Sequence, residues 1–158
     1  MPERGAARGG RGFTIRIGSE RVRPPLPVSR VRQIVTRVLR GEAKAARRAG
    51  SSGEVTVTFL GPSRMRRLNR EWKGHDRPTD VLSFRLPQPG GGAALDVYIC
   101  PAVARAQARD YGISSREELT RLVVHGLLHT LGYDHPEGEG RTRSPMWRRQ
   151  EHYVKALV

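Results

Sequence analysis

Alternating apolar and polar positions mark four segments of the chain as strands. The clearest is EVTVTFL, in which Val55, Val57 and Phe59 fall on one face of a pleated strand. Short runs rich in β-branched and aromatic residues, bounded by glycine or proline, are typical of strands. The pattern predicts strands at residues 13–17, 54–60, 81–86 and 96–100. The stretch PQPGGGAA between the last two strands predicts a hairpin.

Apolar residues at three- and four-residue intervals predict helices elsewhere. The helix in the last third of the chain is apolar nearly all round, so we expect it in the core. Ser115 and Glu118 form a capping-box pattern at its start. Trp72, near the end of an earlier helix, is expected in the core as well. The predicted helices cover residues 28–48, 62–72, 101–111, 115–131 and 144–158.

This order of elements, β-α-β-α-β-β-α-α-α, predicts an α+β fold in which helices pack on a small mixed sheet. The chain of 158 residues has the length of one domain. Residues 1–12 are rich in glycine and arginine, so we expect a disordered tail there and a single domain over residues 13–158.

The net charge of the chain gives information about its binding partner rather than about its fold. Lys and Arg number 29 against 15 Asp and Glu, which gives a formal net charge of +14. Such an excess favours a polyanionic partner, most often nucleic acid. A solvated, arginine-rich surface without such a partner would give the same count.

The length of the apolar runs and the number of cysteines indicate where in the cell the chain is expected. No apolar run approaches the roughly 20 residues that cross a membrane, so we expect no membrane association. The single cysteine, Cys100, forms no intramolecular disulfide and fits a reducing, cytoplasmic location. We interpret Cys100 as a small buried apolar residue.

The segment HGLLHTLGYDH predicts a metal site. His125 and His129 are four residues apart on the predicted core helix, so their side chains lie on one face. Gly132 can end the helix in the left-handed conformation and turn His135 back toward them. Three histidine ligands that leave an open position are typical of catalytic Zn²⁺, one ion per chain, although another divalent transition metal would fit.

The same segment lacks a base that zinc proteases use. Those enzymes carry a glutamate directly after the first histidine of the helix, and here the residue is Gly126. Gly126 therefore argues against a peptidase. A metal-activated water needs no strong helix base when the substrate is a phosphodiester held by nearby cations.

Three motifs together resemble one family. HGLLHTLGYDH, RPTDVLSF with LNREWKGHD before it, and MWRRQE are similar to the YbeY family of bacterial metal-dependent endoribonucleases, over residues 54–151. The resemblance implies cleavage of single-stranded RNA in processing of the 3′ end of small-subunit ribosomal RNA, and ribosome quality control. It also implies the small ribosomal subunit and assembly factors such as the GTPase Era as partners.

The resemblance also implies roles for particular residues. The metal ligands are His125, His129 and His135, and Asp134 matches an aspartate beside the third ligand. Asp134 either handles a proton or orients His135. Asp80 and Ser83 match the segment that lines the family's cleft, although Asp80 could simply cap a turn before its strand. Asp96 matches a further aspartate on a strand, but Leu95 stands where the family has glycine.

The chain departs from the family at position 73. The family has an arginine after the aromatic residue, thought to bind the RNA phosphate, and this chain has Lys73 after Trp72. Lysine keeps the charge and loses the bidentate fork. Either Lys73 takes that role, or Arg70 or Arg77 replaces it.

Two functions stay open on the sequence. The first is a metal-dependent endoribonuclease. The second is a metal-containing ribosome assembly or RNA-binding factor with little nuclease activity of its own.

Overall fold

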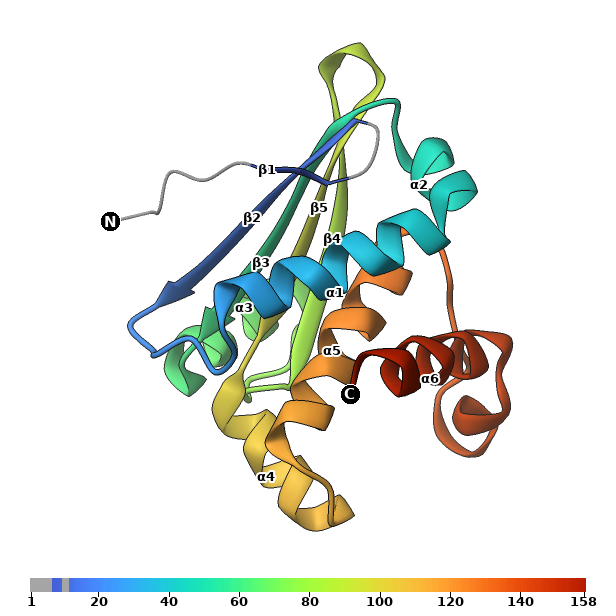
Figure 1. Cartoon of the computed structure of the whole chain (residues 1–158). Coiled ribbons are helices and arrows are strands. Elements are labelled where there is room, and N and C mark those ends of the chain that lie inside the picture. The colour runs from blue at the N-terminus through green and yellow to red at the C-terminus, as the bar shows by residue number, and fades with distance from the viewer. Residues whose placement is uncertain (1–6, 10–11) are drawn as a thin grey trace.

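The computed structural model describes residues 7–9 and 12–158, which form a five-stranded sheet packed with helices (Figure 1). The strands are β1 (Ala7–Gly9), β2 (Phe13–Glu20), β3 (Gly53–Leu60), β4 (Val81–Gln88) and β5 (Gly92–Ile99). Their order in the sheet is β1-β2-β3-β5-β4. The strands β2, β3 and β5 are parallel, whereas β1 and β4 are antiparallel to their neighbours at the two edges.

The helices fill the connections and the C-terminal half. They are α1 (Val28–Gly41), α2 (Ala43–Ala49), α3 (Pro62–Lys73), α4 (Pro101–Tyr111), α5 (Ser115–Thr130) and α6 (Pro145–Leu157). Two short 3₁₀ helices are η1 (Pro89–Gly91) and η2 (Gly138–Arg143). The α+β class with a small mixed sheet is therefore confirmed. Within the described ranges, no helix is long and apolar enough to cross a membrane.

The two faces of the sheet carry separate apolar clusters. On one face α1 and α5 lie across the strands, and their apolar residues merge with those of β2, β3 and β5 in the main core (Figure 1). On the other face α3 packs through a smaller cluster of Leu60, Met65, Leu68, Leu82 and Cys100. Cys100 is fully buried and free, as expected. This division matters because α5, which carries two of the histidines, lies on the first face.

Helix α5 is buried nearly all round, which confirms its predicted place in the core. Its start differs from the prediction. The N-cap is Ser114, whose Oγ accepts a hydrogen bond from the backbone N–H of Glu117 at 3.1 Å. The S-x-x-E pattern therefore begins one residue earlier than expected, which frees Glu118 to turn its side chain into the protein, where it is 3% exposed.

Two other boundaries differ from the sequence pattern. The helix expected over residues 28–48 breaks at Glu42, whose non-helical backbone separates α1 from α2. The carboxylate of Glu42 is 4% exposed and accepts hydrogen bonds from Tyr133 and Tyr153, so the break turns it toward these hydroxyls. The hairpin β4–β5 is longer than expected, because most of the Gly/Pro-rich stretch pairs across its two strands.

The N-terminal segment and Trp72 also differ from expectation. Residues 7–9 of the tail expected to be disordered pair with β2, whereas residues 1–6 and 10–11 lie outside the described part of the chain. Trp72 is 60% exposed, so its predicted core position is wrong. Its ring packs against Phe84 of β4 with a centroid distance of 5.2 Å. Because β4 is the edge strand, no further strand covers the indole.

Candidate metal centre and the pocket beside it

The three histidines of the sequence motif meet at one point. His125 and His129 lie on α5, and His135 follows the turn after it. One ring nitrogen from each lies within 4.8 Å of the other two. The ring centroids are 4.6 to 5.2 Å apart. In the described part of the chain, this is the group of histidine and acidic side chains that could hold a metal ion.

The turn that brings His135 back depends on Gly132. Its φ of +97° is a conformation that residues with a Cβ atom rarely adopt. The backbone N–H of Tyr133 then donates to the carbonyl of Leu128 at 3.0 Å and closes the turn. The predicted helix-ending role of Gly132 is therefore confirmed.

Each imidazole is held by an acceptor at its Nδ1 atom. His125 Nδ1 lies 2.7 Å from Oε1 of Gln150, His129 Nδ1 lies 3.0 Å from the carbonyl of Tyr133, and His135 Nδ1 lies 3.0 Å from the carbonyl of Pro136. Carbonyl oxygens only accept, so all three rings carry the proton on Nδ1. The three Nε2 lone pairs are left for a metal.

The protonation of the rings also fits metal binding. Burial lowers the pKa of His125 to about 4. The pKa of His129 is also lowered, first by burial and then by the neighbouring His135. Both imidazoles are therefore neutral near pH 7, which is the form that binds a metal. Three imidazole nitrogen donors with no thiolate or carboxylate fit a divalent transition metal with an open coordination position.

Gly126 has a structural explanation. A Cβ atom at this position would lie 2.6 Å from Cγ1 of Val97 and 3.2 Å from Cγ2 of Val81. Position 126 therefore faces the sheet, on the side of α5 that packs most closely against β4 and β5. A glutamate could not fit there, so the close packing of α5 excludes the base that zinc proteases carry.

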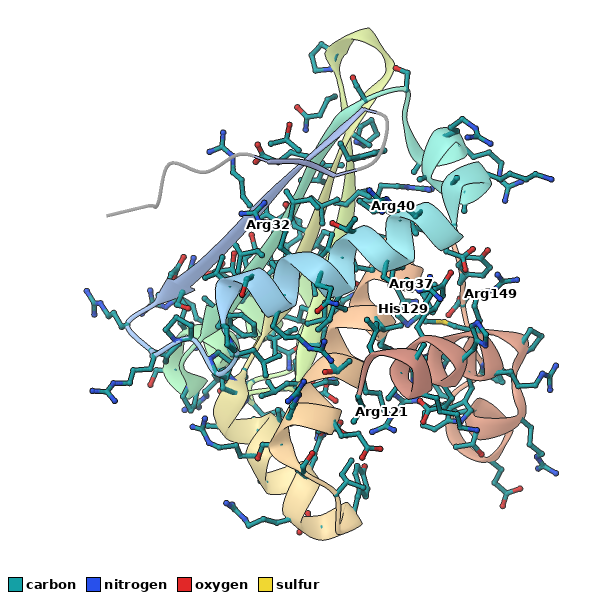
Figure 2. The ribbon with its side chains drawn as sticks, in the orientation of Figure 1. Arg32, Arg37, Arg40, Arg121, His129 and Arg149 are labelled. Carbon is teal, nitrogen blue, oxygen red and sulfur yellow. The ribbon has the colours of Figure 1, made fainter. Side chains whose placement is uncertain are left out.

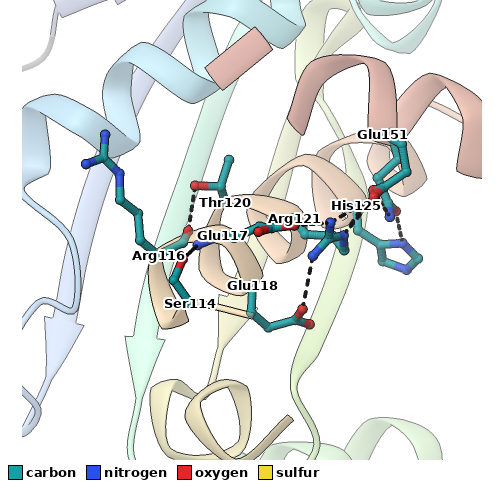
Figure 3. A network of polar contacts seen from close by, with 9 residues as sticks. Ser114, Arg116, Glu117, Glu118, Thr120, Arg121, His125 and Glu151 are labelled. Carbon is teal, nitrogen blue, oxygen red and sulfur yellow. Dashed lines mark hydrogen bonds and ion pairs between the residues drawn. The ribbon is translucent and has the colours of Figure 1, made fainter. Parts of the chain in front are cut away.

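A network of charged residues continues from His125 into α6 (Figure 3). Gln150, which accepts from His125, donates its Nε2 to Glu151 at 3.2 Å. Glu151 accepts from Arg121 at 2.8 Å, and Arg121 also pairs with Glu117 at 2.9 Å and with Glu118 at 3.3 Å. Contacts between α5 and α6 thus hold the ring of His125 in place.

A pocket of about 480 Å³ opens beside His125. It is bounded by α4, α5, η2 and α6, and its walls include Asp80, Tyr111, Glu118, Arg121, Arg141 and Trp147. A larger hollow of about 950 Å³ lies against β2, β3 and β5, where Asp96 lines it with Glu54. The larger hollow shares no residue with the histidine group, so we assign the chemistry to the smaller pocket.

The structure brings two of the predicted acidic residues to the metal region. Asp80 lines the pocket with His125, and its Oδ1 also accepts from the backbone N–H of Val81 at 2.7 Å. Asp134 is exposed, and its Oδ1 accepts from the backbone N–H of His135 at 2.8 Å. Both carboxylates therefore have a local structural contact, and both remain next to the centre.

Ser83 faces the metal helix from β4. It pairs with Val97 in the sheet and has the same parity as Val81, so it lies on the face that α5 covers. Ser83 is not among the residues that line the pocket beside His125.

The three predicted cations lie elsewhere. Lys73 places its Nζ 5.9 Å from the ring centroid of Phe84, on the opposite face of β4 from α5. Arg70 lies 3.6 Å from Asp76, and the carbonyl of Arg77 accepts from Asn69 at 2.8 Å. All three are exposed, and none lines the pocket.

Sequence reasoning missed the residues that support the centre from a distance. Gln150 and Glu151 lie within the motif MWRRQE, which was a signal for a helix and not for a contact with His125. No sequence pattern distinguished Arg141 from the many other arginines.

The arginines are spread over several elements. Figure 2 labels arginine side chains on α1, α5 and α6. The basic surface predicted from the charge is therefore contributed by several elements.

Comparison with known proteins agrees with the sequence motifs. A relative from Brevibacillus brevis called endoribonuclease YbeY is 40% identical over 129 residues, covering 72% of this chain and 80% of its own. A relative of the same description from a Sulfurihydrogenibium species is 46% identical over 89 residues, and the match spans 59% of its length. A solution structure of a Thermotoga maritima protein matches with a TM-score of 0.53 and 28% identity, covering 90% of this chain and 88% of that one.

The family model described as endoribonuclease YbeY matches residues 17–158, which includes every strand from β3 onward, the histidine group and the pocket. The resemblance read from the three motifs is thus confirmed, and the endoribonuclease class expected from them agrees with it. The chain belongs to the endoribonuclease YbeY family.

Proposed function

We propose that this chain is a metal-dependent endoribonuclease that cleaves single-stranded RNA. The observation that carries the proposal is the arrangement of His125, His129 and His135: one ring nitrogen of each lies within 4.8 Å of the other two, and each Nδ1 has an acceptor. One Zn²⁺ per chain fits these three nitrogen donors. When bound, such an ion lowers the pKa of a water ligand and polarises a phosphoryl oxygen.

The residues of the chain would divide the remaining work. Asp80 lines the same pocket as His125, so its carboxylate is our candidate for holding a proton during cleavage. Asp134 holds the backbone of His135, and we propose that it orients this ligand. Gly126 excludes a helix base. Glu118 and Glu151 also line the pocket but are paired with Arg121, so Asp80 is the proposed acidic group.

The predicted cations suit a more distant part of the RNA. Arg70, Lys73 and Arg77 are exposed on α3 and on the loop after it, outside the pocket. We propose that they bind phosphates of the strand away from the cleavage point, where exposed cations contribute affinity. Ser83 lies on the other face of β4, toward α5, so it is not part of this surface. An endonuclease contacts several nucleotides, so such a surface agrees with the net charge of +14.

The biological setting is proposed from the family. We propose that the substrate is ribosomal RNA, with processing of the 3′ end of the small-subunit RNA and ribosome quality control as the setting. The partners would be the small ribosomal subunit and assembly factors such as the GTPase Era, in the cytoplasm. The match to the family over residues 17–158 supports each of these.

A cleavage assay with metal control tests the proposal. Protein purified without a histidine tag should contain about one metal ion per chain and should cleave a labelled single strand faster than the matching duplex. A chelator should abolish cleavage, and Zn²⁺ should restore it. His129→Ala should lose both metal and cleavage, whereas His75→Ala, which removes an exposed histidine outside the metal group, should lose neither.

Two results would contradict the proposal. Cleavage that survives chelation and His129→Ala would mean that the histidine group is not the reactive centre. Metal-loaded protein that binds the single strand without cutting it would favour the assembly factor with little nuclease activity.

A further inference from the structure

Arg141 occupies a fixed position at the wall of the pocket beside His125. It lies in η2, one turn before α6, and its carbonyl accepts from Ser144 Oγ at 2.7 Å and from the Ser144 N–H at 3.2 Å. Ser144 is itself buried and caps α6, since its Oγ accepts from the N–H of Trp147 at 3.1 Å. The backbone of Arg141 is therefore tied to the first turn of α6.

The side chain of Arg141 has one buried donor without an acceptor. Its guanidinium lies 6.0 Å from the ring centroid of Trp147, which supports it from one side. Its Nε is buried and makes no hydrogen bond. Within residues 7–9 and 12–158, no carboxylate forms an ion pair with Arg141, and a buried donor left unpaired is unfavourable. Because no ion pair neutralises its charge among the described residues, the guanidinium of Arg141 is available to an anion in the pocket that it lines.

The other arginine at the wall of the pocket is already occupied. Arg121 is held by Glu117, Glu118 and Glu151 at 2.8 to 3.3 Å. Its donors neutralise these carboxylates, so it has little capacity for a further anion. Of the two arginines that line the pocket, Arg141 is the one whose guanidinium can take a new partner.

The position of Arg141 relates it to the metal centre. Arg141 and His125 both line this pocket, so the two side chains border the same space. An anion bound by Arg141 in the pocket would therefore lie next to His125.

An exposed aromatic ring stands at the same pocket. Tyr111, the last residue of α4, lines it and is 66% exposed. Exposed aromatic rings next to basic side chains are typical of sites where single-stranded nucleic acid stacks its bases. The volume of about 480 Å³ falls within the range of about 300 to 1,000 Å³ typical of small-molecule sites.

We propose that this pocket binds one nucleotide of the RNA strand next to the metal, with Arg141 on its phosphate and Tyr111 against its base. This inference rests on the proposed function and adds to it the residue that binds phosphate at the centre. It differs from the expectation that Lys73, Arg70 or Arg77 has that role, because none of these lines the pocket. Arg141 can offer two parallel N–H donors to phosphate oxygens, which lysine cannot.

Binding to metal-free protein tests the inference without cleavage. The probe is a fluorescent single-stranded RNA decamer, measured by anisotropy in the presence of a chelator. Arg141→Gln should weaken binding by about 10-fold or more, the scale of a lost charge-assisted contact. Arg143→Gln is the matched control, since it removes the same charge from an exposed position two residues away and outside the pocket. It should weaken binding by less than about threefold, as a general charge effect.

Further variants keep the result interpretable. Arg141→Lys should fall between the wild type and Arg141→Gln, and it covers the case in which Arg141→Gln folds poorly. Tyr111→Ala should weaken binding, and Tyr111→Phe should not, because stacking needs the ring and not the hydroxyl. Thermal melting and zinc content of each variant should match those of the wild type.

The outcomes separate the inference from the proposed function. Wild-type protein that neither binds nor cleaves single-stranded RNA would overturn the proposed function. Wild-type protein that binds and cleaves, while Arg141→Gln and Arg141→Lys both bind like Arg143→Gln, would overturn the inference and leave the proposed function standing.

Discussion

Gln150 gives a direct measure of how strongly α6 supports the metal centre. Its Oε1 lies 2.7 Å from Nδ1 of His125, and the side chain is 1% exposed. Gln150→Leu removes this acceptor with a small change in volume. The Nδ1–H of His125 would be left unpaired, so the ring would lose the contact that selects its tautomer and orientation.

The expected effect of Gln150→Leu is on metal affinity. Residues that hold a ligating histidine are typically worth about 10- to 100-fold in metal affinity, or about 1.4 to 2.7 kcal/mol. The pair is buried, since His125 is 7% exposed, so water cannot easily replace the lost acceptor. We therefore expect the upper part of that range. Gln150→Glu keeps an acceptor for His125 but replaces the donor to Glu151 with a second carboxylate oxygen, so it should retain only part of the affinity.

Competition with a chromogenic zinc chelator at pH 7 measures this affinity. His152→Leu is the control, because it changes an exposed histidine on the same helix, outside the metal group. Unfolding of the chelated proteins shows whether a variant has lost its fold instead. A Gln150→Leu protein that folds and binds zinc as tightly as wild type would refute the reasoning that this contact positions His125.

Other consequences concern packing, buried charge and pH. Gly126→Ala should lower the free energy of unfolding by up to about 2 kcal/mol, because overpacking costs about 1–3 kcal/mol and the helix gains about 1 from alanine. Val97→Ala should relieve that clash, so in urea unfolding the double variant should lose less stability than the sum of the two single variants. Strictly additive losses would contradict the clash. Glu42→Gln should cost about 2 kcal/mol by weakening the charged contacts to Tyr133 and its neighbours, and should also weaken zinc binding; an unchanged urea midpoint would contradict this. Because the pKa of His125 is about 4 when folded and about 6.5 when unfolded, only the unfolded chain takes up a proton between these values. The metal-free protein should therefore lose about 3 kcal/mol from pH 6.5 to 4, measured by denaturant unfolding, and His125→Gln should reduce that loss.

The meeting of the three histidines could be predicted from the sequence because its geometry is local. His125 and His129 are related by one helical turn, and Gly132 reverses the chain to His135 within a few residues. Helical periodicity and one glycine with a positive φ are enough to bring the three rings together. Nothing in this part of the site depends on a contact between distant segments.

The buried helix and the fold class were determined in the same way. The apolar residues of α5 surround the helix, so any fold of this chain had to place it inside. Alternation along β3 and the order of the elements implied a small mixed sheet. Local patterns could not show that α1 ends before Glu42, because the partners Tyr133 and Tyr153 are 91 and 111 residues away in the chain.

Only the tertiary structure decided what surrounds the histidines. Gln150 is 25 residues from His125, and Arg121 is 30 residues from Glu151, so no local pattern relates them. The chain has 29 lysine and arginine residues. Their number indicates a basic surface, but it does not show which of them line the pocket or which of those is left without an ion pair. Packing decides this, since Arg121 is held by carboxylates while Arg141 forms no ion pair among the described residues. Sequence thus determined the histidine group, whose members are close along one helix and its turn, and long-range packing determined the acceptor and the pocket around it.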